Sequence, residues 1–232
     1  MRQSIAFPLP SGFSIEHLLK KVELFSEAVV LNSNIESQNF QDPYCKYDLI
    51  AAIGSLEELK CNKDSFSELE KMLQKEDWHF GYFTYDLKNE LENLNSSNPD
   101  FVQFPSLHFF RPRWVLRFTK DLVRVDFDIQ TDTEQSALTF AKELLHFPFP
   151  EESETEEKPP PKIRERVSKE DYLSTVRKIQ KHIQRGDIYE MNYCVEFFAE
   201  QADINPAESY SRLNTISPMP FSCYYKLRDH YL

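Results

Sequence analysis

The chain has 232 residues, of which 41% are hydrophobic and 14% aromatic, so it can bury one large core or two smaller ones. This composition excludes an intrinsically disordered chain. The formal net charge of −11 argues against binding to nucleic acid or to an anionic membrane, because phosphate groups are held by cationic surfaces. A small anionic substrate is still compatible with this charge, since a basic pocket can lie inside an acidic protein.

The sequence shows no targeting or membrane-spanning signal. Residues 1–10 include one basic residue but no apolar run, and no stretch approaches the ~18 consecutive apolar residues of a membrane span. The cysteines have no C-x-x-C spacing; they are Cys45, Cys61, Cys194 and Cys223. We therefore expect reduced thiols, no metal site in this chain and a cytoplasmic location.

Before residue 150 the apolar patterns mix strands and helices without a regular alternation. They predict strands over 28–31, 78–85, 109–118 and 122–129, and helices over 65–76 and 134–145. Residues 78–85 are aromatic on both faces, which predicts a central strand covered on two sides. Gly81 in that strand would allow a neighbour to pack closely. The pattern favours an α+β fold over a doubly wound sheet.

The clearest boundary is an acidic run at 151–157 followed by Lys-Pro-Pro-Pro at 158–161. Like charges resist collapse and consecutive prolines stiffen the chain, so these residues predict an extended linker. A solvated loop is the simpler interpretation, and a partner-binding segment is the alternative. We expect an N-terminal domain over 1–150, a linker over 151–162 and the start of a second domain over 163–232.

After the linker the pattern predicts a helix and then a strand. Ser168 resembles a helix N-cap, an apolar stripe follows it, and Gly186 supplies the stop. The next residues alternate, which places Glu190 and Asn192 on one face of a strand about 7 Å apart. That polar face either faces water or forms one wall of a substrate cleft, and spacing alone does not decide between them.

Residues 172–192, which end in Gly-Asp-Ile-Tyr-Glu-Met-Asn, resemble the start of the chorismate-binding domain in the large subunits of anthranilate synthase and aminodeoxychorismate synthase. Further segments resemble the same family in the same order: 80–94, 104–114, 205–210 and 216–222. The resemblance implies antiparallel sheets packed as a sandwich with helices outside.

Within the family, the compact N-terminal part and the short spacing from Phe80 to Gly186 resemble aminodeoxychorismate synthase more than anthranilate synthase. Such enzymes replace a hydroxyl of chorismate with ammonia, on the route to para-aminobenzoate and folate. The resemblance further implies a glutamine amidotransferase partner that supplies ammonia, and Mg²⁺, which as a Lewis acid would neutralise the substrate carboxylate and polarise the leaving hydroxyl. The alternatives are an anthranilate synthase component I and a non-catalytic module that binds a ligand or docks a partner.

Glu190 departs from the pattern of the family. Relatives that add water carry lysine there and ammonia users usually carry glutamine. A carboxylate at this place could orient or deprotonate an incoming ammonium, or it could be a tolerated variant. No residue of this chain is therefore assigned firmly as catalytic, and Glu190 and Asn192 are candidates for the cleft wall.

A second candidate site concerns an amino-acid ligand. Family members hold tryptophan between a Leu-Glu-Ser-type strand and a Pro-x-Pro-aromatic segment, which Leu-Asn-Ser at 31–33 and Pro-Met-Pro-Phe at 218–221 resemble. Ser33 could bind the carboxylate or amine, and Pro220 and Phe221 could contact the indole. Asn32 replaces the acid that would pair with the ammonium group, which favours simple packing between the two segments.

The resemblance places the family's Ser-Pro-Glu-Arg segment, its catalytic histidine and its magnesium-binding glutamates after the hairpin expected over 227–232. We therefore expect this chain to be the N-terminal half of a larger enzyme, to be inactive by itself, and to leave sheet edges unpaired.

Overall fold

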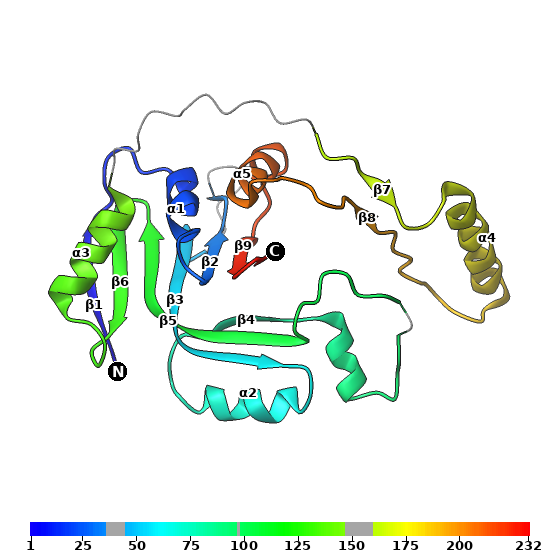
Figure 1. Ribbon diagram of the computed structural model, residues 1–232, viewed down its shortest axis with the longest axis horizontal. Coiled ribbons are helices and arrows are strands. Elements are labelled where there is room, and N and C mark those ends of the chain that lie inside the picture. The colour runs from blue at the N-terminus through cyan, green and yellow to red at the C-terminus, as the bar shows by residue number, and fades with distance from the viewer. Residues whose placement is uncertain (36–44, 97, 147–159) are drawn as a thin grey trace. The chain divides into compact units, whose positions relative to one another are not determined.

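The computed structural model describes residues 1–35, 45–96, 98–146 and 160–232 (Figure 1). The chain forms two compact units, Met1–Phe149 with Pro206–Leu232, and Pro150–Asn205. The expected acidic linker lies mostly outside the described residues. In this structure residues 206–232 pack with the N-terminal residues, and the grouping of 163–232 as the start of a separate domain stays a prediction.

The first unit is built on an eight-stranded sheet in the order β1-β6-β5-β3-β2-β9-β10, with β4 paired to β5 beside this path. Every pairing is antiparallel. The strands are β1 (Arg2–Pro8), β2 (Glu27–Asn32), β3 (Leu49–Cys61), β4 (Phe80–Phe83), β5 (Leu107–Thr119), β6 (Leu122–Asp128), β9 (Ser222–Leu227) and β10 (His230–Tyr231).

The register joins distant parts of the chain. The expected hairpin of β5 and β6 is confirmed, with Thr119 opposite Leu122. At the other side of the sheet β9 pairs along the whole of β2, with Val30 opposite Tyr224. The long strand β3 pairs with β2 only as far as Ile53, and its register against β5 shifts just beyond that point. The later half of β3 therefore continues past β2 with β5 and β4.

Helices α1 (Ile15–Val22), α3 (Glu134–Leu145) and α5 (Pro206–Ile216) cover one face of this sheet (Figure 1). Their buried side chains join the inward residues of the strands in one core, because each helix places apolar residues along a single stripe. The hydroxyl of Ser14 accepts from Glu16 N at the start of α1, and Thr133 forms a capping box with Ser136 at the start of α3.

The opposite face carries a second cluster around Val115, Phe110 and Tyr225. Here β4 is followed by the 3₁₀ helix η2 (Tyr85–Glu90), and α2 (Ser65–Leu73) packs beside β3. The expectation of a central strand at 78–85 is wrong: β4 has four residues and pairs on one side, with β5. The expected close approach at Gly81 is confirmed, because a Cβ there would overlap the carbonyl oxygen of His108.

The second unit contains α4 (Lys169–Arg185) and a two-stranded sheet of β7 (Arg164–Glu165) and β8 (Phe197–Phe198). The expected helix ends are confirmed: Ser168 accepts from Asp171 N, and Gly186 takes φ +80°. Although its sequence is amphipathic, no residue of α4 is buried. The chorismate-type motif thus lies in a unit without a core of its own among the described residues.

The strand expected after Gly186 is not formed over residues 188–196, and only Phe197 of the alternating segment belongs to a strand, β8. Tyr189 and Phe197 are 92% and 65% exposed. In the described part of the chain no strand pairs with residues 188–196, and an extended segment needs a neighbour to bond its backbone groups. Alternation of apolar and polar residues was therefore not sufficient to predict a strand here.

The predicted α+β class is confirmed. The packing of two sheets as a sandwich stays a prediction, since the described residues form one large sheet and one two-stranded sheet. Among these residues, none of the helices has the length and apolar character needed to cross a bilayer.

Candidate functional site

Side-chain amides join the end of β2 to α5 and to the turn before β9. Asn34 donates from Nδ2 to Asn214 Oδ1 at 2.8 Å and to the carbonyl oxygen of Met219 at 2.8 Å. Its Oδ1 accepts from Asn32 Nδ2 and Asn214 Nδ2, both at 2.9 Å. Ser222 Oγ donates to Asn214 Oδ1 at 3.0 Å, and this set of residues is called the amide cluster below.

The amide cluster occupies the place where the sequence predicts an amino-acid pocket, and the pieces that the sequence named lie near one another. Asn32 ends β2 and Ser33 follows it, while the turn with Pro220 precedes β9, which pairs with β2. Ser33 uses its hydroxyl to donate to the carbonyl oxygen of Tyr47 at 2.8 Å. The hydroxyl expected to contact a ligand therefore already holds a neighbouring segment.

The aromatic part of the expected pocket lies in the open. Pro220 is exposed, and Phe221 is 89% exposed with a φ of +63°, in the turn that leads into β9. The amide groups, in contrast, satisfy one another. The arrangement supports packing between the two segments as the role of these residues, and binding of an amino acid stays a prediction.

Asn34 is the residue that the sequence analysis missed. It is 9% exposed and takes a φ of +48°, in the left-handed region that asparagine tolerates better than most residues. Its type and its place directly after the Leu-Asn-Ser segment were a usable signal. The partner Asn214 lies far along the chain, so no local pattern could have paired them.

Glu190 and Asn192 lie in the second unit, in an irregular segment after α4, and both are exposed. Without a strand, the argument that they share one face no longer holds. They follow the turn at the end of α4 in the sequence. In that turn Asp187 Oδ2 lies 2.7 Å from His182 Nδ1 and also accepts from Arg185. These contacts fix the end of the helix, and a role for Glu190 and Asn192 in a cleft stays a prediction.

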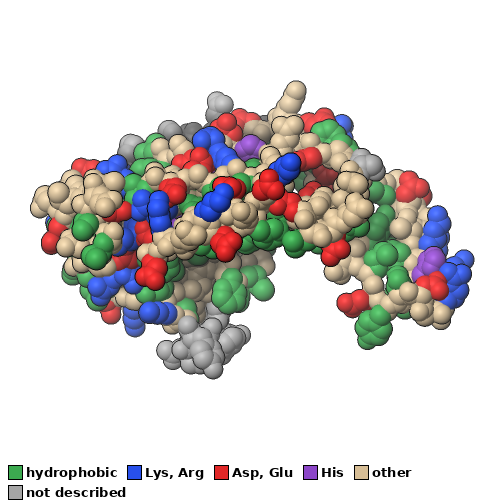
Figure 2. All heavy atoms as spheres, turned by 90° about the horizontal axis from the view of Figure 1, so that it is seen from below, with side chains coloured by type: hydrophobic (Ala, Val, Ile, Leu, Met, Phe, Trp, Pro, Cys, Tyr) green, Lys and Arg blue, Asp and Glu red, His purple; other side chains and the backbone are tan. Residues whose placement is uncertain are grey.

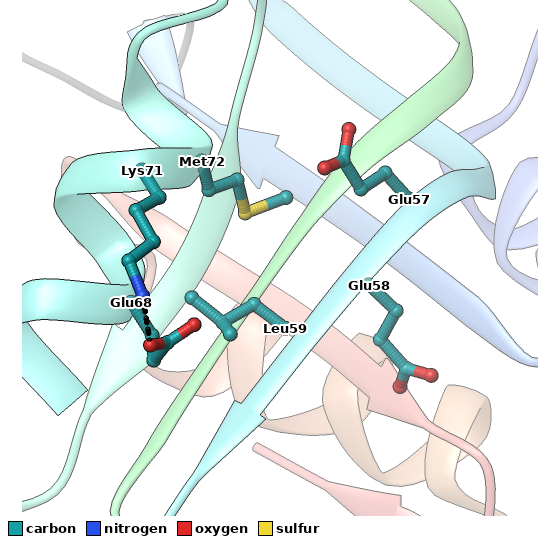
Figure 3. Close-up of a pocket in the computed structure, with 6 residues that line it drawn as sticks. All are labelled: Glu57, Glu58, Leu59, Glu68, Lys71 and Met72. Carbon is teal, nitrogen blue, oxygen red and sulfur yellow. Dashed lines mark hydrogen bonds and ion pairs between the residues drawn. The ribbon is translucent and has the colours of Figure 1, made fainter. Parts of the chain in front are cut away.

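A small pocket of about 170 Å³ lies between α2 and the later half of β3 (Figure 3). Its lining is rich in carboxylates, but each has a cationic partner. Glu57 pairs with Lys75 at 2.5 Å, Glu68 pairs with Lys71 at 2.5 Å, and Glu58 pairs with Lys60 at 2.8 Å. Hydrogen bonding by Lys75 holds the pKa of Glu57 below its usual value. The pocket is therefore a salt-bridged surface hollow.

Ion pairs also join arginines of β5 to carboxylates of β6 and to Asp77 in the first unit. Arg111 contacts Asp77 at 3.1 Å and Asp128 at 2.7 Å, and Arg117 contacts Asp126 at 2.6 Å. In the space-filling view, acidic and basic side chains are interspersed over the visible face (Figure 2). The surface in that view matches ordinary solvation better than a patch for a polyanion.

The magnesium implied by the resemblance does not fit the described residues. In the part of the chain that the structure covers, no group of three His, Cys, Asp or Glu side chains is placed to share a metal ion. The carboxylates of the small pocket are already neutralised by lysines. A magnesium site stays a prediction for the enzyme as a whole.

Comparison with known proteins identifies the protein family. Residues 26–232 match the model of a family described as chorismate binding enzyme, so the chain belongs to the chorismate-binding enzyme family. The match includes residues of both units of the structure.

Individual relatives are distant. The chain is 28% identical over 152 residues to anthranilate synthase component 1 of Thermus thermophilus, covering 64% of this chain and 33% of that protein. It is 27% identical over 166 residues to anthranilate synthase component 1 of Acetivibrio thermocellus, covering 63% and 33%. An anthranilate synthase component I-like protein of Synechocystis is 25% identical over 151 residues, covering 63% and 30%. The chain thus spans about a third of the length of these relatives.

Proposed function

We propose that this chain is part of a chorismate-aminating enzyme of the aminodeoxychorismate synthase type. The observation that carries the proposal is the family match over residues 26–232, which includes the helix–Gly–Asp motif at the end of α4. The reaction replaces the 4-hydroxyl of chorismate with an amino group from ammonia and releases water, giving 4-amino-4-deoxychorismate, a precursor of para-aminobenzoate and folate.

The choice of product rests on the N-terminal part. In the resemblance noted from the sequence, the spacing from Phe80 to Gly186 and the compact N-terminal part are closer to aminodeoxychorismate synthase than to anthranilate synthase. The second candidate is anthranilate synthase component I, which the names of the Thermus and Acetivibrio relatives favour. A non-catalytic module that binds a ligand or docks a partner is the third candidate; among the described residues, the side chains of the amide cluster hydrogen-bond one another.

The proposal includes a partner and a metal ion. A glutamine amidotransferase would supply ammonia, and Mg²⁺ would hold the carboxylate of chorismate; both are what the resemblance to the family implies. The amidotransferase proposal predicts turnover with glutamine only when that partner is present, while free ammonia supports turnover without it.

The experiment is an assay of chorismate consumption by the protein expressed from its complete gene, with ammonia and magnesium. Consumption that depends on both supports the proposal, and a protein that binds its ligands but never consumes chorismate contradicts it.

A further inference from the structure

A buried histidine links three strands of the first unit. His108 on β5 is fully buried, with Nε2 at 3.0 Å from Glu58 Oε1 on β3 and Nδ1 at 2.5 Å from the hydroxyl of Tyr225 on β9. The other carboxylate oxygen of Glu58 accepts from Arg228 at 3.2 Å, in the turn between β9 and β10. None of these contacts belongs to the backbone pairing of the sheet.

The strand order of the sheet shows what these contacts connect. β9 pairs with β2 and β10, while β2 leaves β3 at Ile53, before Glu58 is reached. The β9–β10 hairpin therefore reaches the β4 end of the sheet through side chains. Aromatic contacts lie beside them: the rings of Tyr82 and Tyr225 are 5.3 Å apart, and those of Phe104 and His230 are 4.9 Å apart.

We propose that Glu58, His108, Tyr225 and Arg228 form a proton-operated clasp, which holds the β9–β10 hairpin against the β4 end of the sheet and releases it on acidification.

The proton positions follow from the chemistry of the groups. A carboxylate only accepts, so the proton of a neutral His108 ring lies on Nε2 and is donated to Glu58. Nδ1 is then the acceptor for the hydroxyl of Tyr225. A second proton on Nδ1 would face that hydroxyl, which would have to turn its own proton away from the ring.

The surroundings oppose that second proton. Burial lowers the pKa of His108, although the hydrogen bond to Glu58 acts in the opposite direction, and the charges of Lys60 and Arg228 lower it further. Tyr82, the other titratable group beside the ring, contributes a hydroxyl that is buried without a partner. Burial of the ring therefore makes the closed clasp more stable with a neutral imidazole than with a charged one.

Glu58 itself stays charged. Burial alone would raise the pKa of Glu58, but hydrogen bonds from Lys60 and His108 and the charge of Arg228 bring it below its usual value. Glu27 on β2 responds in the opposite sense, because burial and the charge of Glu58 raise its pKa. Protonation of Glu27 therefore stabilises the closed form at low pH. Comparing the parent with a variant that differs only at His108 removes this contribution.

The sign of the pH dependence follows. The pKa of His108 is lowered from 6.5 in the closed form, so the open form binds more protons once the pH falls below about 6.5. The ratio of open to closed clasp should then rise by up to about fivefold between pH 6.5 and 5.5, and by less than about twofold between pH 7.5 and 6.5.

The test is hydrogen exchange measured by mass spectrometry on the full chain from pH 7.5 to 5.5, corrected for intrinsic exchange rates. We expect the peptide over 222–232 to lose protection below pH 6.5. His108→Gln should flatten this dependence, and the exposed His182→Gln should leave it unchanged. Protection that is independent of pH in the parent, or a dependence that His108→Gln retains, overturns the proposal.

A second measurement tests the proposal even if the His108→Gln variant does not fold. Nitrogen-15 NMR of the parent imidazoles should show His108 neutral at pH 6.5 with its proton on Nε2. A charged ring, or a proton on Nδ1 alone at that pH, overturns the proposal.

Discussion

Replacing Asn34 with alanine would remove the side chain that connects β2 with α5 and with the turn before β9. The change deletes two donated hydrogen bonds, to Asn214 Oδ1 and to the carbonyl oxygen of Met219, and two that Asn34 Oδ1 accepts, from Asn32 and Asn214. At about 1 kcal/mol for each bond, the loss is about 4 kcal/mol in the free energy of unfolding. Alanine in the left-handed region adds about 1 kcal/mol, so we expect about 5 kcal/mol in total.

Asn34→Gly separates the two contributions. Glycine loses the same hydrogen bonds but takes a φ of +48° without a Cβ penalty, so we expect it to cost about 4 kcal/mol. The alanine variant should therefore melt about 10–20 °C below the parent and the glycine variant about 8–16 °C below it, for a cooperative unit of this size.

Urea unfolding followed by tryptophan fluorescence measures this directly. Both tryptophans, Trp78 and Trp114, lie in the first unit, so the signal reports the unit that contains the amide cluster. The midpoint should fall while the slope of the transition stays that of the parent. An alanine variant within 1 kcal/mol of the parent would refute the account of the amide cluster, and a glycine variant as unstable as alanine would refute the argument from φ.

Three further outcomes are expected. Gly81→Ala should destabilise the first unit by about 3 kcal/mol in urea unfolding, because the new Cβ would overlap the carbonyl oxygen of His108, whereas unchanged stability would show that β4 can shift at no cost. Tryptophan titration by calorimetry tests the predicted amino-acid pocket: saturable binding that Ser33→Ala abolishes supports it, and no binding by the parent removes it. In the enzyme from the complete gene, Glu190→Gln should lower kcat with ammonia at unchanged unfolding stability if the carboxylate orients ammonium; equal kcat would make Glu190 a tolerated variant.

Local patterns predicted the elements whose stabilisation is local. The helices α3 and α4 have their caps and their periodicity in consecutive residues, and β5 and β6 are joined by a short turn. Their boundaries in the structure agree closely with those expected. The capping hydrogen bonds of Ser168 and Thr133 are contacts over three residues, which a sequence shows directly.

Features that depend on distant partners were missed or wrong. The strand β1 begins two residues from the N-terminus and is defined by its pairing with β6, and the amide cluster joins Asn34 to Asn214. Residues 188–196 alternate as a strand does, yet no described strand pairs with them. A periodic pattern states which face a segment could bury, but pairing also needs a neighbour with free backbone groups.

The same distinction applies to the candidate sites. The sequence brought Ser33 and Pro220 into one hypothesis through the resemblance, and the structure does place the strands that they flank, β2 and β9, side by side. It could not show that the hydroxyl of Ser33 is engaged by Tyr47, because that contact depends on the path of the chain between them. A role for Glu190 was inferred from its residue type. Its environment depends on contacts with residues distant in the sequence, which a local pattern does not show.

The most direct test of the central claim is the identity of the product. The protein expressed from its complete gene is incubated with chorismate, ammonia and magnesium, and the products are separated by chromatography and identified by mass spectrometry. The account predicts 4-amino-4-deoxychorismate, which an added lyase converts to para-aminobenzoate. Accumulation of anthranilate would contradict the proposed reaction and leave the family assignment intact, and recovery of unchanged chorismate would contradict the proposal that the chain belongs to an aminating enzyme.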